Sequence, residues 1–220
     1  MKAVGLFGGT FDPIHQGHLD VARAVHEALS LETVRFIPAR RPPHRTPPLA
    51  SAAHRFAMTA LAIAGDARLR VSDAEMDQDG PSFTIDTLDR IERIEPARTG
   101  TFVFITGSDA FRDIRTWHRW PDLLDRCHFA VVSRVGLPAA TLREALPDLA
   151  ARMHDAPCPV TATPGIFLVD AATAPVSSTE LRQALTEGAP VDDLLPDAVA
   201  EYAVRHGLYR APGALEAPRG

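Results

Sequence analysis

The amino-acid sequence predicts an α/β fold: an open parallel β-sheet with helices on both faces and a helical C-terminal end. Short runs of β-branched and aromatic residues alternate along the chain with segments of helical period, an alternation typical of β-α-β units. Of the 220 residues, 45% are hydrophobic, which is enough for one substantial core. We therefore expect a single domain over residues 1–210, followed by a disordered tail at 211–220.

The first half of the chain begins this pattern. AVGLF, residues 3–7, is an apolar run of the kind that forms a buried parallel strand, and LDVARAVHEAL, 19–29, has apolar residues at helical spacing. A second helix is predicted at 51–65, with Ser51 as its cap and Gly65 as its terminator. The other predicted elements of this half are strands at 33–39 and 68–75.

The second half continues the alternation. TIDTLDRIERIE, residues 84–95, predicts a helix capped by Thr84, and TFVFITG, 101–107, is the next strong strand. The remaining predicted elements are strands at 128–134 and 165–170, a helix around 139–151, and two closing helices at 178–187 and 196–206.

Charge and cysteine content limit the partners and the compartment. The chain has 23 basic and 28 acidic residues, a formal net charge of -5, so its overall field attracts neither nucleic acid nor an anionic membrane. Cys127 and Cys158 lie far apart, form no CxxC unit, and occur without a signal-peptide pattern or a long apolar run. We expect a cytoplasmic protein with no nucleic-acid or membrane partner. A homo-oligomer remains open.

The stretch GGTFDPIHQGH, residues 8–18, lies where the first predicted strand gives way to the first helix. Open α/β sheets bind phosphates at such turns, on the free amides of the helix. Gly8 and Gly9 would let backbone amides approach a ligand closely. Two better-known phosphate motifs, GxGxxG and GxxxxGK[ST], do not occur in this region.

His15 and His18 are three residues apart at the predicted helix start. Their side chains would share one face of the first turn, with Cβ atoms about 5–6 Å apart, so both could reach one anion. A histidine held there can donate hydrogen bonds to charge that develops in a reaction. Two alternatives remain open: a zinc site with Asp12 as a third ligand, and ordinary helix-start residues with no chemistry.

Two further stretches are candidates for anion binding. RRPPHRTPP, residues 40–48, is stiffened by four prolines and contains four potentially cationic side chains, His44 and Arg45 among them. It could clamp a polyphosphate or be a solvated connection. In SSTELR, a helix that starts at Ser178 or Thr179 would direct hydroxyls and amides at an anion, with Arg182 one turn on. The alternative is a plain N-cap followed by a surface arginine.

The strand at 101–107 ends on residues suited to a ribose. Gly107 would allow close approach and Asp109 would offer a carboxylate to hydroxyl groups, while a helix N-cap is the competing interpretation of Asp109. Trp117 lies in a polar segment, where a flat indole could stack on an aromatic ligand. Packing is the alternative for Trp117.

At this point the sequence resembles a known family. GTFDPIHQGH is similar to the signature of the nucleotidyltransferase superfamily that contains the HxGH motif. Within that superfamily the chain resembles the bacterial nicotinate-nucleotide adenylyltransferases from residue 2 to about residue 210. The fragments that carry this resemblance, in order along the chain, are PPHR (42–45), GPSFTIDTL (80–88), FITGSD (104–109), TWHRW (116–120) and VSSTELR (176–182).

The resemblance implies a Rossmann-like nucleotidyltransferase domain over 1–210. It also implies transfer of the adenylyl group of ATP to nicotinate mononucleotide, giving nicotinate adenine dinucleotide and pyrophosphate. The reaction would be an in-line displacement without a covalent intermediate, because the attacking phosphate is already ionised near neutral pH. Magnesium is the implied cofactor, held mainly by the ATP phosphates and water.

The same resemblance assigns residues to the site. The implied catalytic residues are His15, His18, His44 and Arg45, with His18 stabilising the α-phosphoryl group. The implied ATP contacts, besides the two histidines of the HxGH motif, are Gly8, Gly9, Thr10, Phe11, Gly107, Asp109, Ser178, Thr179 and Arg182. The implied nicotinate mononucleotide contacts are Asp12, Ser82, Phe83, Thr84, Trp117 and Arg134.

Three departures from the family pattern bear on these assignments. Arg45 replaces the commoner lysine, which keeps the charge and adds a fork for phosphate oxygens. Phe83 stands where tyrosine is common, and Val135 replaces the proline of an RPG-type element. The last two departures affect the choice between an acid and an amide acceptor and leave the phosphate chemistry untouched.

Other functions remain open at the level of sequence. Adenylyltransferases for nicotinamide mononucleotide or phosphopantetheine share the HxGH chemistry, and Trp117 favours a pyridine acceptor over the latter. A cytidylyltransferase would use the same histidines with another base pocket. A non-catalytic nucleotide sensor would need no transition-state contacts, so the intact HxGH histidines argue against it.

Overall fold

A computed structural model describes residues 3–43, 46–95 and 100–210 and has a parallel sheet at its centre. The sheet is seven-stranded, its order is β3-β2-β1-β4-β5-β7-β6, and neighbouring strands are parallel. Its strands are β1 (Val4–Gly9), β2 (Thr33–Pro38), β3 (Leu69–Val71), β4 (Phe102–Gly107), β5 (His128–Val132), β6 (Met153–Asp155) and β7 (Ile166–Val169). This arrangement confirms the predicted Rossmann-like α/β fold.

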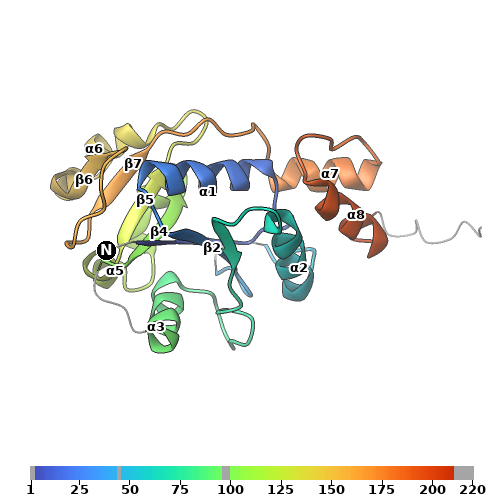
Figure 1. Cartoon of the computed structure of the whole chain (residues 1–220), viewed down its shortest axis with the longest axis horizontal. Coiled ribbons are helices and arrows are strands. Elements are labelled where there is room, and N and C mark those ends of the chain that lie inside the picture. The colour runs from blue at the N-terminus through green and yellow to red at the C-terminus, as the bar shows by residue number, and fades with distance from the viewer. Residues whose placement is uncertain (1–2, 44–45, 96–99, 211–220) are drawn as a thin grey trace, which may run out of the picture.

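The longer helices connect these strands or follow the last of them (Figure 1). They are α1 (Gln16–Ala28), α2 (Ala52–Ile63), α3 (Thr84–Ile94), α7 (Ser178–Glu187) and α8 (Asp197–Arg205). Shorter helices are α4 (Ser108–Arg112), α5 (Trp120–Arg126) and α6 (Leu142–Ala145), with 3-10 turns at Ile114–Thr116, Ala139–Thr141 and Pro147–Arg152. The helical C-terminal end is thus formed by α7 and α8.

Side chains that alternate along the strands build one core on each face of the sheet. In β1, Leu6 belongs to one core and the next residue, Phe7, to the other, because successive residues of a strand point to opposite faces. The first core packs α1, α2, α7 and α8 against the sheet, through residues such as Val25, Met58, Leu181 and Val199. The second core packs α3, α4, α5 and α6, through residues such as Ile85, Phe111, Leu123 and Leu142. Figure 1 shows α1 and α3 on opposite sides of the sheet.

Helix ends follow local chemistry. The predicted cap at Ser51 is confirmed, because its side chain accepts a hydrogen bond from the amide of His54 at 3.3 Å. The helix predicted at 84–95 begins at Thr84, but its N-cap is Phe83 and not Thr84. Likewise Gly107, and not Asp109, is the N-cap of α4.

The helix predicted around 139–151 is wrong as a continuous element. The structure has a 3-10 turn, four residues of α6 and a second 3-10 turn that starts at Pro147, whose missing N–H and fixed ring interrupt a helix. The edge strand β6 that follows was not predicted, nor were α4 and α5 between β4 and β5. The strand predicted at 68–75 is shortened to Leu69–Val71.

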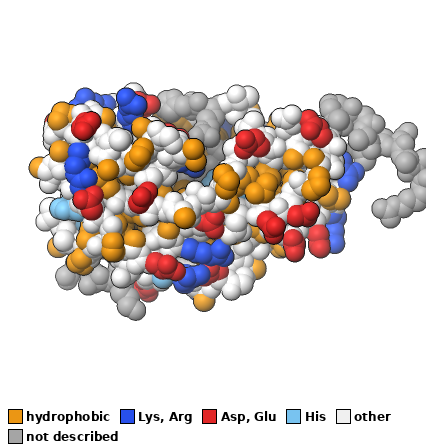
Figure 2. All heavy atoms as spheres, turned by 90° about the horizontal axis from the view of Figure 1, so that it is seen from above, with side chains coloured by type: hydrophobic (Ala, Val, Ile, Leu, Met, Phe, Trp, Pro, Cys, Tyr) orange, Lys and Arg blue, Asp and Glu red, His pale blue; other side chains and the backbone are white. Residues whose placement is uncertain are grey.

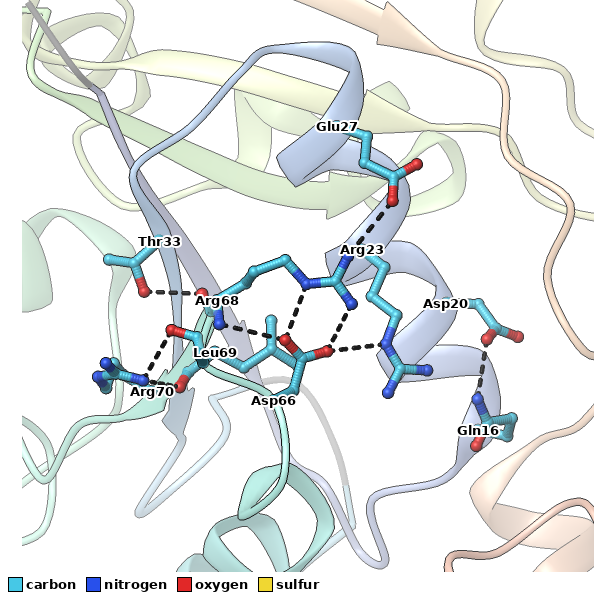
Figure 3. Close-up of polar contacts among 10 residues, drawn as sticks. Gln16, Asp20, Arg23, Glu27, Thr33, Asp66, Arg68, Leu69 and Arg70 are labelled. Carbon is cyan, nitrogen blue, oxygen red and sulfur yellow. Dashed lines mark hydrogen bonds and ion pairs between the residues drawn. The ribbon is translucent and has the colours of Figure 1, made fainter.

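Ion pairs fasten α1 to the turn before β3 (Figure 3). Asp66 accepts hydrogen bonds from Arg68 Nε and Nη2, both at 2.8 Å, and from Arg23 Nε of α1 at 3.1 Å. Arg68 also pairs with Glu27 on α1 at 3.3 Å. These contacts hold the helix that carries the two histidines against the β2–β3 side of the sheet.

The molecular surface carries charges of both signs. In Figure 2 basic, acidic and apolar side chains are interspersed, and acidic side chains gather at the end formed by α7 and α8. Positive groups at a site on this chain therefore act locally. Within the described residues, no helix is both long and apolar enough to cross a membrane.

Candidate active site

The HxGH motif lies at the carboxyl end of β1, in the middle of the sheet. β1 pairs with β2 on one side and with β4 on the other, so the strand order changes direction at this strand and leaves a crevice at its end. His15 is the N-cap of α1, with an extended backbone at φ -147° and ψ 173°. The N-terminal end of α1 therefore lies at the end of β1, where the sequence predicts a phosphate site, while the amides of Gln16 and His18 donate to the carbonyls of Leu194 and His15, each at 2.9 Å.

The two motif histidines form a stacked pair. Their ring centroids are 3.7 Å apart and the ring planes differ by 30°. The backbone amide of His15 donates to Nδ1 of His18 at 3.3 Å, so Nδ1 is an acceptor and the proton of a neutral His18 ring lies on Nε2. Gly17 permits this packing, because a Cβ there would be 3.2 Å from the Ala174 carbonyl and 3.3 Å from the His15 ring.

His15 and His18 differ in environment. His15 is 4% exposed, and burial, followed by the nearby Arg134 charge, lowers its pKa to about 4. His15 is therefore neutral at pH 7, and its buried Nδ1 has no hydrogen-bond partner in the described structure. His18 is only half-buried. The pair thus consists of a buried, neutral ring, that of His15, and a ring that is more accessible, that of His18.

The turn after β1 places Phe11 inside the molecule. Phe11 has a φ of 49°, is 2% exposed, and meets the His18 ring edge-on at 5.0 Å. A Cβ on Gly9 would lie 2.7 Å from the Phe11 ring, so this glycine is needed for packing. Phe11 and Gly9 were predicted as ATP contacts, and only their backbones are in a position to serve as such.

Asp12 was predicted to bind nicotinate mononucleotide, and the structure gives its side chain a different role. The carboxylate is 4% exposed. It accepts hydrogen bonds from the amides of Leu49 and Ala50, at 2.8 and 3.1 Å, and from the Tyr209 hydroxyl at 2.7 Å. In this structure the Asp12 carboxylate braces the turn, because both of its oxygens accept hydrogen bonds from the protein, and its assignment as a nicotinate mononucleotide contact stays a prediction.

Arg55 braces the same turn and was missed from the sequence. Its guanidinium is 1% exposed and donates to the carbonyls of Thr10 at 2.7 Å, Ala50 at 3.2 Å and Arg40 at 3.3 Å. Burial lowers the pKa of Arg55. A signal was present in the sequence, because Arg55 shares the buried face of α2 with Met58, Thr59 and Ile63, where a charge needs partners.

The start of α7 meets the HxGH turn, as predicted. Ser178 Oγ donates to the Pro13 carbonyl at 3.0 Å. Arg182 Nη1 donates to the Asp12 carbonyl at 2.8 Å, and its Nη2 donates to Thr179 Oγ1 at 3.2 Å. The N-cap is Ser177, which forms a capping box with Glu180. The structure thus brings Ser178, Thr179 and Arg182 beside the histidines.

The carboxyl end of β4 adds a second charged pair to the crevice. Asp109 lies in the first turn of α4, and its Oδ1 is 3.6 Å from Nε of Arg134, just beyond β5. Both side chains are more than half exposed, at 57% and 52%. A Cβ on Gly107 would lie 2.4 Å from Asp109 Oδ1 and 2.8 Å from Arg134 Nε, so these three residues lie together, and the Arg134 charge contributes to the lowered pKa of His15.

Trp117 and Phe83 both pack against the second core. Trp117 meets Phe104 edge-on at 6.0 Å, and Phe104 lies against Gly8, where a Cβ would be 3.1 Å from its ring. Phe83 packs on His118 with ring centroids 4.6 Å apart. The structure therefore places beside Phe83, one of the predicted nicotinate mononucleotide contacts, a ring that the sequence did not identify, that of His118, next to Trp117 in the chain.

A buried polar network holds Ser82 against the segment that starts at Arg40. Ser82 accepts from the Arg41 amide at 3.1 Å and from Gln78 Nε2 at 2.8 Å, and its own amide donates to the Arg41 carbonyl at 2.9 Å. Glu75 accepts from Gln78 and Thr87, and its burial raises its pKa. The Ser82 side chain is thus committed to the protein. Thr84, at the start of α3, is half-buried beside it.

His44 and Arg45, predicted as catalytic residues, lie outside the described residues, as does the predicted tail at 211–220. The zinc alternative for the HxGH pair has no third ligand here, because both oxygens of Asp12 are hydrogen-bonded. Among the described residues no group of three His, Cys, Asp or Glu side chains could hold a metal ion.

Comparisons with known proteins agree with this geometry. The model of a family described as cytidylyltransferase-like matches residues 6–184. A probable nicotinate-nucleotide adenylyltransferase of Pseudomonas fluorescens is 44% identical over 215 residues, which cover 96% of this chain and 99% of that protein. One of Pseudomonas syringae pv. tomato is 41% identical over 218 residues, or 99% and 98% of the two chains.

Solved structures agree on the fold. Nicotinic acid mononucleotide adenylyltransferase of Plasmodium falciparum, complexed with NaAD, superposes with a TM-score of 0.73 at 21% identity, over 95% of this chain and 98% of that one. The same enzyme complexed with APC gives a TM-score of 0.72, with the same identity and coverage.

Proposed function

The chain belongs to the cytidylyltransferase-like family, alongside the nicotinate-nucleotide adenylyltransferases, and we propose that it transfers the adenylyl group of ATP to nicotinate mononucleotide. The products are nicotinate adenine dinucleotide and pyrophosphate, so the enzyme acts in NAD biosynthesis. The observation that carries the proposal is the assembly at the end of β1, where the stacked His15–His18 pair meets Arg182 and the start of α7.

The chemistry needs positioning and charge stabilisation more than a base. The phosphate of the mononucleotide is ionised near pH 7, so it attacks the α-phosphorus of ATP in line without losing a proton to the protein. His18 supports this step as a donor toward an α-phosphate oxygen, because its Nδ1 accepts the His15 amide, which puts the proton of the neutral ring on Nε2. The amides of α1 and the guanidinium of Arg182 add positive potential for the leaving pyrophosphate.

We propose that the magnesium ion reaches the site bound to the phosphates of ATP. The groups that the starts of α1 and α7 bring to the crevice are imidazoles, a guanidinium, hydroxyls and amides, a donor set that suits phosphate oxygens better than a divalent cation. The carboxylate of Asp109 is paired with Arg134. When bound to the triphosphate, the ion neutralises phosphate charge. We propose that this chain holds it only through the nucleotide.

The acceptor end of the site rests on the aromatic group beside Gly8. Trp117 offers an indole face for the pyridine ring, and Phe83 and His118 form the adjoining wall. The free amides at the start of α3, from Thr84 onward, are suited to the nicotinate carboxylate. This end of the site supports a preference for the acid over the amide mononucleotide. We propose the cytoplasm as the compartment, in keeping with two free cysteines.

The deciding experiment measures pyrophosphate release by the purified chain with magnesium and ATP. Nicotinate mononucleotide, nicotinamide mononucleotide and phosphopantetheine are compared as acceptors, and CTP replaces ATP in a parallel series. We expect strong preference for ATP and nicotinate mononucleotide. Preference for another acceptor would overturn the pocket around Trp117, and preference for CTP would overturn the base assignment. Tight ATP binding without pyrophosphate release from any acceptor would indicate a nucleotide sensor.

A further inference from the structure

The segment that follows α8 contacts the HxGH turn through the buried side chain of Tyr209. Tyr209 follows α8 and is 7% exposed, and its hydroxyl donates to Asp12 Oδ1 at 2.7 Å, across 197 residues of sequence. We propose that Tyr209 is a positioning residue for the adenylyl-transfer reaction, acting through Asp12 on the turn that presents His15 and His18. This inference rests on the proposed function.

Asp12 is the point through which such an effect passes. Its carboxylate accepts from Tyr209 and from the Leu49 and Ala50 amides, and its carbonyl accepts from Arg182. The residue lies three positions before His15 in the sequence. A carboxylate held on several sides fixes the turn, and a small displacement of the histidines would spoil their alignment with the α-phosphate.

The C-terminal backbone is shaped to deliver this hydroxyl. Tyr209 has a φ of 61°, in the left-handed region that bulky residues rarely adopt. The conformation is held by Thr186 Oγ1 of α7, which donates to the Tyr209 carbonyl at 2.6 Å, and by the Leu208 amide, which donates to the Ala203 carbonyl at 2.9 Å. Strain of this kind persists where surrounding contacts over-determine the conformation, often at functional sites.

Among the described residues, three other hydrogen bonds join the segment from α7 onward to the turn, and all three engage backbone atoms of the turn. Ser178 donates to the Pro13 carbonyl and Arg182 to the Asp12 carbonyl, while the Gln16 amide donates to the Leu194 carbonyl at 2.9 Å. Tyr209 instead contacts the side chain that also holds Leu49 and Ala50. Burial and the adjacent Asp12 charge raise the pKa of Tyr209, so its hydroxyl stays a donor throughout the working pH range.

The chain offers a matched control, because it contains only two tyrosines. Tyr202 on α8 has its hydroxyl 3.0 Å from Nδ1 of His54 on α2, away from the turn. Tyr209→Phe and Tyr202→Phe each remove one hydroxyl and leave the ring. We expect Tyr209→Phe to lower kcat about 5- to 20-fold at a temperature well below its melting point, with KM for nicotinate mononucleotide within about twofold. Tyr202→Phe should retain wild-type kinetics.

A purely structural role for Tyr209 predicts another pattern, in which Tyr209→Phe melts earlier but turns over at the wild-type rate below its melting point. That pattern would overturn the inference. Thr186→Val is the second variant if Tyr209→Phe does not fold. It removes the hydrogen bond to the Tyr209 carbonyl and leaves the Tyr209 hydroxyl in place. It should lower kcat in the same direction by a smaller factor, and wild-type kinetics would likewise overturn the inference.

Failure of the proposed function is recognisable separately, because the wild-type chain would then release no pyrophosphate with nicotinate mononucleotide. In that case amide hydrogen exchange decides the point. Tyr209→Phe should speed exchange at Leu49 and Ala50 at least about tenfold relative to Tyr202→Phe, while the amides of β1 keep their protection. Equal exchange at Leu49 and Ala50 in the two variants would overturn the role of Tyr209.

Discussion

At the scale of single residues, the HxGH pair shows how one motif yields two environments. The spacing predicts two side chains on one helix face, and the structure stacks them at 3.7 Å. The sequence could not predict that His15 is buried and influenced by Arg134, because Arg134 reaches the crevice from β5, far along the chain. The two rings therefore differ in environment, and we propose that His18, the more exposed of the two, is the donor to the α-phosphate.

The ring of His15 should remain neutral through the physiological range. Its pKa in the fold is about 4, below the ordinary value of 6.5, so protonation favours the unfolded chain. The stability this neutral ring contributes is complete above pH 6.5 and is lost as pH falls toward 4, by about 3 kcal/mol in all. An NMR titration of the imidazole nitrogens measures the pKa, with His15→Gln identifying the resonance. An inflection above pH 6 would contradict the assignment.

Removing His18 should damage the chemical step more than nucleotide binding. One preorganised donor to a developing charge contributes about 3–4 kcal/mol to the barrier, so His18→Ala should lower kcat about 10²-fold or more, with a smaller change in the Kd for ATP. Steady-state kinetics and calorimetric titration with ATP measure the two quantities. His26→Ala, near the other end of α1, is the control. Near-normal turnover in His18→Ala would exclude it from the reaction.

At the scale of elements, α1 depends on contacts outside its own sequence. The Asp66 carboxylate accepts from Arg68 and from Arg23 of α1, as Figure 3 shows. Hydrogen bonds from Arg68, ahead of those from Arg23, hold the pKa of Asp66 far below its usual range. The network therefore contributes stability only while Asp66 is ionised.

Asp66→Asn should destabilise the fold by about 1 kcal/mol at pH 7, a value discounted for solvent screening. Because the folded pKa is depressed, this contribution is complete above the ordinary pKa of 3.8. It fades as pH falls below that value, because the carboxyl of the unfolded chain then binds a proton that the folded chain does not. Urea unfolding of both proteins between pH 7 and pH 3 measures the difference. Glu27→Gln, at a side chain 70% exposed, is the control. A constant difference across this range would contradict the electrostatic origin.

Long periodic elements were predictable from the sequence, and short ones were not. The helix at 178–187 is confirmed to the residue, since its capping serines and apolar spacing are local signals. The continuous helix predicted at 139–151 is wrong because Pro147 interrupts it, although this helix breaker is visible in the sequence. β6 spans three residues and lies at the edge of the sheet, paired with β7, so this pairing and not its own composition makes it a strand.

At the scale of the whole molecule, the candidate site draws its residues from elements on both faces of the sheet. α1 and α7, which carry the phosphate-side residues, pack in the first core, whereas Phe83 and Trp117 pack against the second. Motifs and resemblance located both halves in the sequence. The two residues that hold the HxGH turn in place from elsewhere in the chain, Arg55 and Tyr209, were missed. Arg55 bonds to Thr10 across 45 residues and Tyr209 bonds to Asp12 across 197, and no periodicity or motif links such distant positions.

This division predicts that the binding of ATP and the binding of nicotinate mononucleotide can be weakened independently. Trp117 contacts Phe104 of the second core and no residue of the HxGH turn in the described contacts. Loss of a stacking face costs about 1–3 kcal/mol, so Trp117→Ala should raise KM for nicotinate mononucleotide about 10- to 100-fold, with KM for ATP unchanged. Trp117→Phe keeps a ring and should lose less.

Trp120 provides the matched control, because the chain contains only two tryptophans. It begins α5 and packs on the same core, so Trp120→Ala should lower thermal stability and leave both KM values near wild type. Steady-state kinetics with each substrate varied in turn measures the pattern. If Trp117→Ala raised both KM values equally, the two halves of the crevice would act as one unit, and the assignment of Trp117 to the pyridine ring would be wrong.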